Sequence, residues 1–335
     1  MVFNATTTAR RSLPQLRRFA SVTAPTPKIL VTGALGQLGV GLVQLLRNKY
    51  GANNVISSDV RKPTAAMRSE GPFVFGDVLD YKQLESIVVN NDVTWIINLS
   101  ALLSAVGEMH MDRALAINMQ GFQNTLELAK RHQLRILCPS TIGAFGPSTP
   151  RDNTPDLTIM RPTTIYGITK VHVELMGEYY HRRFGVDFRS LRYPGIISAD
   201  TEPGGGTTDY AVQIFHSALK DNAYKCYLGP DTALPMMYLP DCLNGTVSFL
   251  SAPTESLTQR TYNMAAFSFT PKEISAKIAE RVKGFETTYE PDYRQAIADS
   301  WPRSLDDSIA RKDWGWKNEY DLDGMVDDML VRLRK

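Results

Sequence analysis

Tyr166 and Lys170 stand four residues apart in the segment Tyr-Gly-Ile-Thr-Lys, which has the pattern of a helix. Side chains at positions i and i+4 lie on one helical face, so the phenol and the ammonium group are expected to be neighbours. A free tyrosine has a pKa of about 10, and a nearby ammonium group in a sheltered site stabilises the phenolate. The pair therefore predicts a general base that removes a proton from an alcohol.

Thr141 is the third residue with a chemical role in this hypothesis. It lies in the segment Pro-Ser-Thr-Ile-Gly-Ala, directly after the predicted strand 135–138. Its hydroxyl can hold the substrate oxygen next to the phenol. Ser140 is the competing candidate for the same role.

A glycine loop near the start of the chain predicts a phosphate-binding turn. Gly33, Gly36 and Gly39 follow the predicted strand 28–32 and open a helix that runs to Tyr50. In this context the first glycine allows a tight turn, the second lets the backbone approach a pyrophosphate, and the third permits close packing of helix and sheet. The helix N-terminus then offers free N–H groups to the phosphates.

Asp59, twenty residues after Gly39, indicates which dinucleotide binds. A carboxylate there can accept both ribose hydroxyls of NAD but repels the 2′-phosphate of NADP. We therefore expect NAD, although Arg61 can offset part of the repulsion and leaves NADP open. Asp77, in the segment Gly-Asp-Val, either accepts from the adenine amino group or caps a turn or helix.

The elements around these residues alternate between strand and helix. Predicted helices span 81–89, 109–133, 165–184 and 210–220, and predicted strands span 28–32, 54–58, 73–75, 94–99, 135–138 and 186–191. Such alternation predicts an α/β fold with a doubly wound parallel sheet. Residues 139–161 read as a loop at the carboxyl end of a strand, where these sheets bind ligands. We expect a nucleotide-binding domain over 28–195, with returns to the sheet near 238–264, and mainly a substrate-binding cap over 196–335.

Composition excludes several other classes of protein. The chain has 335 residues, 43% of them hydrophobic and 21% charged, and a net charge of +2. This balance gives no reason to expect a nucleic-acid partner, and no apolar run reaches the roughly 18 residues of a membrane span. Three widely spaced cysteines and five histidines form no disulfide framework and no metal-ligand pattern, so we expect no metal.

Residues 1–27 differ from the rest of the chain. They contain Arg10, Arg11, Arg17 and Arg18 among Ser, Thr and Leu, and the first acidic residue of the chain is Asp59. An arginine-rich, acid-free start is typical of a mitochondrial transit peptide. The alternative is a disordered tail that carries no address.

Together these motifs resemble the extended short-chain dehydrogenase/reductase superfamily. The matching segments are 32–39, 76–78, 98–101, 139–146, 166–170 and 192–196, with Asp59 and Asn118. The resemblance implies a Rossmann core that binds NAD and a homodimer formed through a four-helix interface. It implies that Lys170 also binds the nicotinamide ribose, that Ile196 lies at the carboxamide, and that Asn118 supports the site. The other cofactor-binding residues that it implies are Gln37, Leu38, Val78, Leu99 and Ala101.

Longer segments are similar to the short-chain L-threonine 3-dehydrogenases within that superfamily, namely 33–42, 57–63, 100–108, 203–212, 300–308 and 313–316. This likeness implies a pocket for a small polar substrate, L-threonine, with hydroxyls from Ser104, Thr207 and Thr208. Trp301 is expected to close over it. Ser104 as a helix cap and Trp301 as cap-domain core remain alternatives.

The expected reaction is therefore NAD-dependent oxidation of the 3-hydroxyl of L-threonine to 2-amino-3-oxobutyrate, with Tyr166 as the base. A nucleotide-sugar epimerase or dehydratase is the main alternative, because those enzymes use the same Tyr and Lys. An NAD-binding regulatory protein without catalysis is a third hypothesis, but Thr141, Tyr166 and Lys170 are all present.

Overall fold

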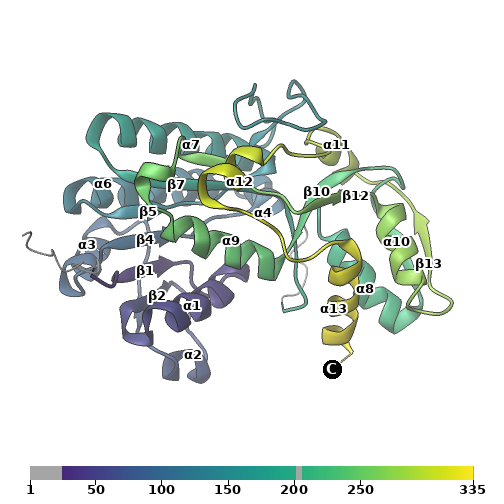
Figure 1. The fold of residues 1–335 in the computed structure, drawn as a ribbon, viewed down its shortest axis with the longest axis horizontal. Coiled ribbons are helices and arrows are strands. Elements are labelled where there is room, and N and C mark those ends of the chain that lie inside the picture. Colours follow the sequence, from purple (N-terminus) through teal and green to yellow (C-terminus); the bar gives the residue numbers. More distant parts are fainter. Residues whose placement is uncertain (1–24, 201–205, 335) are drawn as a thin grey trace, which may run out of the picture.

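A computed structural model describes residues 25–200 and 206–334 of the chain. Its main sheet is parallel throughout and runs in the order β11-β7-β5-β4-β1-β2-β3, with β6 beside β7 (Figure 1). This confirms the predicted doubly wound fold. The strands are β1 (Ile29–Thr32), β2 (Val55–Asp59), β3 (Phe73–Phe75), β4 (Trp95–Asn98), β5 (Arg135–Leu137), β6 (Ser140–Thr141), β7 (Asp187–Tyr193) and β11 (Thr261–Asn263).

Helices cover both faces of this sheet because its strands are apolar on both sides. Ile29 and Val31 of β1 pack into one cluster with α1 (Gln37–Tyr50), α9 (Leu239–Ser251) and α12 (Ser308–Trp314). Leu30, between them, packs into the opposite cluster with α3 (Tyr81–Asn90), α6 (Phe122–His132) and α7 (Ile165–Phe184). The short helix η1 (Ala52–Asn54) lies between α1 and β2, and the short helix α2 (Ala65–Ser69) lies between β2 and β3.

The later part of the chain builds a third core beside the sheet, on the right in Figure 1. It contains a three-stranded sheet, β12-β10-β8, and a two-stranded sheet, β13-β9. Its elements are β8 (Gly195–Ile197), α8 (Tyr210–Asp221), β9 (Ala223–Cys226), β10 (Leu234–Tyr238), β12 (Phe267–Phe269), α10 (Pro271–Ala279), β13 (Glu286–Tyr289), α11 (Arg294–Asp299) and α13 (Leu322–Leu333). A single helical turn, η4 (Thr254–Ser256), precedes β11.

Of the two segments near 238–264 that are predicted to rejoin the main sheet, one does and one does not. Residues 261–263 do rejoin the main sheet, as β11 beside β7. Residues 239–251 instead form helix α9, which packs against α1 through Leu243 at Gly41. Pro240 at the start of α9 suits the first turn of a helix, where its missing N–H costs nothing.

The single helix predicted for 109–133 is interrupted. The chain forms α4 (Ser104–Met109), α5 (Met111–Leu115), a π-helical turn η2 (Ala116–Gly121), and then α6. Asn118 lies in the π-helical turn, and its amide reaches out of the helix to Leu102 and Thr169. Periodicity could not predict the interruption, because it depends on partners elsewhere in the chain.

Helix α7 carries Tyr166 and Lys170, and both of its ends are defined by local sequence. The Thr164 hydroxyl accepts from the Gly167 N–H at 3.1 Å, and Gly185 ends the helix with φ of 71°. These are the expected N-cap and C-terminal glycine signals. At 20 residues α7 is the longest helix in the described part of the chain.

No helix in residues 25–200 or 206–334 has the length and apolar character needed to cross a membrane.

A buried polar network joins α7 to the main sheet. The Arg192 guanidinium on β7 donates to both carboxylate oxygens of Glu174 on α7, at 2.9 and 2.7 Å. It also donates to Asn263 on β11 and to the Asp156 carbonyl. Glu174 and Arg192 are 1% and 3% exposed. Because two desolvated charges satisfy each other here, losing either one leaves an unpaired buried charge.

We therefore expect Glu174→Ala to lower the free energy of unfolding by about 3–5 kcal/mol. Glu290→Ala is the matched control, because its ion pair with Lys225 is exposed on both sides and should contribute less than about 1 kcal/mol. Urea unfolding followed by circular dichroism measures both. A loss for Glu174→Ala as small as that of the control would show that the network does not stabilise the fold.

Candidate active site

One cavity of about 440 Å³ collects most of the predicted site residues at the carboxyl ends of the central strands. This is where ligands bind to open α/β sheets. The predicted residues that line it are Gly33, Gly36, Gln37, Leu38, Gly39, Leu99, Ala101, Ser104, Thr141, Tyr166, Lys170, Ile196, Thr207, Thr208 and Trp301. Asp59, Arg61, Asp77, Val78 and Asn118 are not among its lining residues.

The glycine loop has the shape that a dinucleotide pyrophosphate requires. Gly33 has φ of +66°, and a Cβ there would lie 2.8 Å from the Leu99 backbone. A Cβ on Gly39 would lie 2.6 Å from the Ala34 backbone, so a larger residue would push α1 off the loop. Gly36, directly before α1, would bring its Cβ near only the Gly33 carbonyl, at 3.2 Å. The residues therefore leave an open cradle at a helix N-terminus, which fits a dinucleotide.

Asp59 ends β2 beside this loop and holds it in place. Its carboxylate accepts from the Leu35 N–H at 3.0 Å and from the Arg61 backbone and guanidinium at 3.0–3.2 Å. Burial alone would raise the pKa of Asp59, but the hydrogen bonds from Arg61 and Leu35 outweigh it and keep the pKa below its ordinary value. The carboxylate is therefore ionised near neutral pH, and Arg61, 61% exposed at its side chain, covers it.

Asp77 and Val78 follow β3 and have structural contacts. The Asp77 carboxylate accepts from the Leu79 N–H at 2.9 Å, which is the turn-capping role that the sequence left open. Val78 is 5% exposed and packs against Gly121, while its carbonyl accepts from the Asn124 amide at 2.8 Å. A role of either residue at the adenine remains a prediction.

Tyr166 and Lys170 are neighbours, as their spacing predicts. The Lys170 Nζ lies 5.6 Å from the centre of the Tyr166 ring and donates to the Pro139 carbonyl at 2.7 Å. Helix α7 can approach the strand end because residue 167 is glycine: a Cβ there would lie 2.1 Å from the Gly143 carbonyl. This contact brings the phenol beside the segment that carries Thr141.

The hydroxyls of Ser140 and Thr141 have different partners. Ser140 donates to the Glu174 carboxylate and is buried. Thr141 accepts from the Gly143 N–H at 3.1 Å, which leaves its own proton for a ligand. A Cβ on Gly143 would lie 3.4 Å from the Thr141 methyl and 3.5 Å from the Tyr166 ring, so these two side chains flank one point. The geometry favours Thr141 over Ser140.

Asn118 does not line the cavity but supports it through hydrogen bonds to the loop after β4 and to α7. Its amide accepts from the Leu102 N–H at 2.8 Å, donates to the Leu102 carbonyl at 3.0 Å, and donates to Thr169 at 3.2 Å. It thereby ties the loop after β4 to the helix of Tyr166. The residue is 3% exposed, and its amide is fully used within the protein.

Besides Thr141 and Tyr166, the predicted substrate residues come from three separate segments. Ser104 opens α4, but Leu103 precedes the helix and no side chain caps it. Thr207 and Thr208 lie in the turn before α8. Trp301, 7% exposed, lines the cavity and packs into the third core, and its closing over the substrate remains a prediction.

Two acidic residues escaped the sequence analysis. Asp209 lines the cavity directly after Thr207 and Thr208, and its position beside two hydroxyl residues was the available signal. Glu174 lies four residues after Lys170 on α7, so helical spacing could have placed it on the same face. Its partner Arg192 could not have been predicted, because β7 meets α7 only in the tertiary structure.

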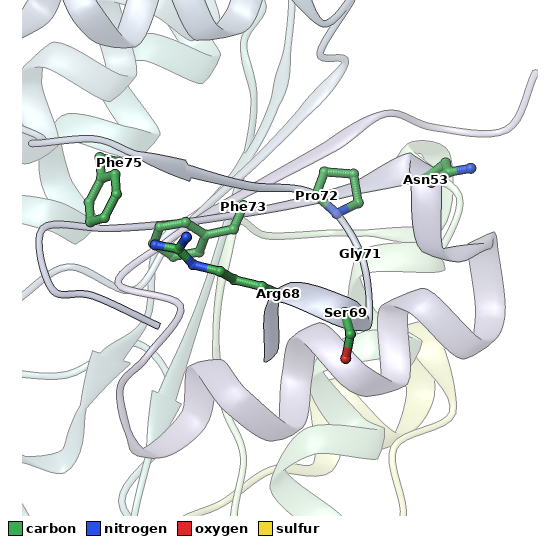
Figure 2. Close-up of a pocket in the computed structure, with 7 residues that line it drawn as sticks. All are labelled: Asn53, Arg68, Ser69, Gly71, Pro72, Phe73 and Phe75. Atoms are coloured by element: carbon green, nitrogen blue, oxygen red, sulfur yellow. The ribbon is translucent and has the colours of Figure 1, made fainter. Parts of the chain in front are cut away.

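A second cavity, of about 460 Å³, opens at the β3 edge of the sheet (Figure 2). Its lining residues come from η1, the end of α2, the loop after α2 and β3, and Arg68 is the only ionisable side chain among them. It contains neither the glycine loop nor the Tyr–Lys pair, and we assign it no role in the chemistry.

Comparison with known proteins defines the class. The family model described as the NAD dependent epimerase/dehydratase family matches residues 29–265. The chain therefore belongs to this family, and its cofactor is NAD.

The names of individual relatives specify an activity within this family. The mitochondrial L-threonine 3-dehydrogenase of Bos taurus is 56% identical over 327 residues, which cover 96% of this chain and 88% of the relative. The crystal structure of L-threonine dehydrogenase from Phytophthora infestans has a TM-score of 0.89 and 56% identity, covering 92% of this chain and 99% of that one. A monomeric L-threonine 3-dehydrogenase from a metagenome has a TM-score of 0.87 and 40% identity, covering 91% and 98%.

Proposed function

We propose that this protein oxidises the 3-hydroxyl of L-threonine to 2-amino-3-oxobutyrate with NAD. One observation carries the proposal: Tyr166, Lys170 and Thr141 line the same cavity as the glycine loop. The relatives named above are L-threonine dehydrogenases, and their similarity to this protein extends over nearly the whole chain. They support the choice of substrate.

In this mechanism Tyr166, as phenolate, takes the proton from the substrate hydroxyl. Lys170 stabilises the phenolate through its charge, and its bond to the Pro139 carbonyl fixes the ammonium group in place. Thr141 donates to the substrate oxygen, because its hydroxyl accepts from the Gly143 N–H and its proton has no partner among the described residues. Bound NAD supplies the hydride acceptor, a capacity that side chains lack.

Different residues of the site would bind the other parts of the cofactor. The open backbone from Gly36 to Gly39 would hold the pyrophosphate, and the Asp59 carboxylate would accept from the adenosine ribose. Lys170 would bind the nicotinamide ribose, and Ile196 would lie at the carboxamide. Support comes from the cradle at Gly36 and the ionised state of Asp59.

A nucleotide-sugar epimerase is the alternative, and the charge of the cavity argues against it. A sugar diphosphate requires basic groups beyond the cofactor site. Among the described lining residues Lys170 is the only cation, and it belongs to the catalytic pair. From sequence alone Arg192 is a candidate to bind the diphosphate, but in the structure it is buried against Glu174.

We expect Tyr166→Phe to lower kcat for L-threonine at least about 100-fold, because the general base is removed. NADH formation, followed by its absorbance, measures turnover. Equilibrium dialysis with NAD should show little change in affinity, because the phenol hydroxyl makes no pyrophosphate contact. Near-normal turnover by this variant would eliminate Tyr166 as the base.

The wild-type protein is assayed in parallel with L-threonine, L-serine, 3-hydroxybutyrate and UDP-sugars. Net NADH with threonine and none with UDP-sugars supports the proposed reaction. Conversion of a UDP-sugar without net NADH would instead support the epimerase alternative.

The NAD preference depends on the Asp59 charge. Asp59→Asn removes the repulsion of a 2′-phosphate and releases the Arg61 guanidinium toward it. Because a charged hydrogen bond contributes about 1.5–3 kcal/mol, the ratio of kcat/KM for NAD over NADP should fall about tenfold or more. Asp92→Asn, in an exposed turn, is the charge-matched control. An unchanged ratio for Asp59→Asn would refute the assignment.

We further propose that two copies form a homodimer through α7 and its neighbouring helices. Ile168, Leu175 and Tyr179 are 48%, 55% and 49% exposed, and their spacing puts them on one face of α7. Met109 and Met111, also exposed, lie on the adjoining α4 and α5. An exposed apolar face of this kind favours association.

Leu175→Asp should convert the dimer to a monomer, because it buries an unpaired charge in the contact. Size-exclusion chromatography with light scattering measures the mass in solution. Val89→Asp, an exposed apolar position on α3, should leave the mass unchanged. A wild-type protein that is monomeric at assay concentrations would contradict the proposed dimer.

The composition of residues 1–27 supports import into mitochondria, as does the mitochondrial name of the Bos taurus relative. Residues 1–24 lie outside the described part of the chain.

We also propose the division of the chain into a nucleotide-binding part over 28–195 and a mainly substrate-binding cap over 196–335.

A further inference from the structure

Asp209 gives the cavity a negative charge that the proposed mechanism does not use. Among the described lining residues only Lys170 and Asp209 are charged. The Lys170 ammonium lies beside Tyr166 and is bonded to the Pro139 carbonyl. The described residues provide the Asp209 carboxylate with one hydrogen bond, from the Gly206 N–H to Oδ2 at 2.8 Å, and with no cation.

The turn that carries Asp209 is anchored on two sides. The Gly206 carbonyl accepts from the Tyr227 hydroxyl at 3.1 Å and from the Asp209 N–H at 3.2 Å. Thr208 packs against β8, where a Cβ on Gly195 would lie 2.9 Å from its Cβ. Because Gly195 and Ile196 line the same cavity, the carboxylate is held at the wall next to the expected nicotinamide site.

An amino-acid substrate brings an ammonium group that needs an anionic partner once water is displaced. The hydroxyls of Ser104, Thr141 and Thr207 are neutral, so Asp209 is the one described lining residue that can neutralise it. Resting on the proposed function, we propose that Asp209 binds the α-ammonium group of the substrate. This contact makes the enzyme prefer 2-amino-3-hydroxy acids to 3-hydroxy acids that lack the amine.

Asp209 also shapes its own turn through the Gly206 N–H, so the test must separate charge from shape. Asp209→Asn keeps an oxygen that can accept from this N–H but removes the negative charge. Asp221→Asn is the matched control, because it removes the same charge from the exposed far end of α8.

The experiment compares L-threonine as substrate with 3-hydroxybutyrate as competitor. The competitor has the same carbon skeleton, carboxylate and hydroxyl, with hydrogen in place of the ammonium group. In Asp209→Asn the KM for L-threonine should rise about tenfold or more, because a charged hydrogen bond is lost. Its kcat should change much less, and the inhibition constant of 3-hydroxybutyrate should stay the same or fall. NAD affinity and the Asp221→Asn kinetics should match those of the wild type.

Two results would overturn the inference. An unchanged KM for L-threonine would show that Asp209 does not bind the ammonium group. An equal weakening of L-threonine and 3-hydroxybutyrate would show that the residue only shapes the turn. Failure of the wild type to oxidise L-threonine would instead overturn the proposed function, which separates the two failures.

Discussion

The buried carboxylate of Glu174 joins the helix that carries Tyr166 and Lys170 to the strands behind the cavity. It accepts from Ser140 on β6 and from Arg192 on β7, so three elements that are distant in the chain meet at one group. Charges buried to this degree are stabilising only as a complete set. This network therefore constrains the angle at which α7 meets the sheet, and with it the position of the phenol beside Thr141.

The site is assembled by contacts of backbone with backbone as much as by side chains. Gly167 lies against the Gly143 carbonyl, and Gly33 and Gly39 let α1 approach β1 and the end of β4. The polar side chains around them fill supporting roles: Asn118 fastens the loop at Leu102, and Asp59 fastens the loop at Leu35. Such preorganisation holds the groups that would bind substrate and cofactor in fixed relative positions, which favours the reaction.

Electrostatic asymmetry separates the two ends of the cavity. The Lys170 ammonium group stands beside the phenol, where it stabilises the phenolate that accepts the substrate proton, and the Asp209 carboxylate stands at the turn before α8. Thus the nucleotide-binding sheet supplies the chemistry, and the turn before α8 supplies a means of telling one alcohol from another. In this arrangement substrate preference can change through residues of the turn while the catalytic helix stays the same.

The sequence by itself determined the alternation of the main strands and helices as far as β7, the glycine loop, and the pairing of Tyr166 with Lys170. These features depend on spacing within one element or one turn, and local periodicity expresses them directly. Only the tertiary structure decided that Ser140 bonds Glu174 and leaves Thr141 to the ligand, that Asn118 lies in a π-helical turn and bonds Leu102, and that Asp209 lines the cavity. Each of these depends on a partner from a distant segment, and one sequence contains no record of which distant segments meet.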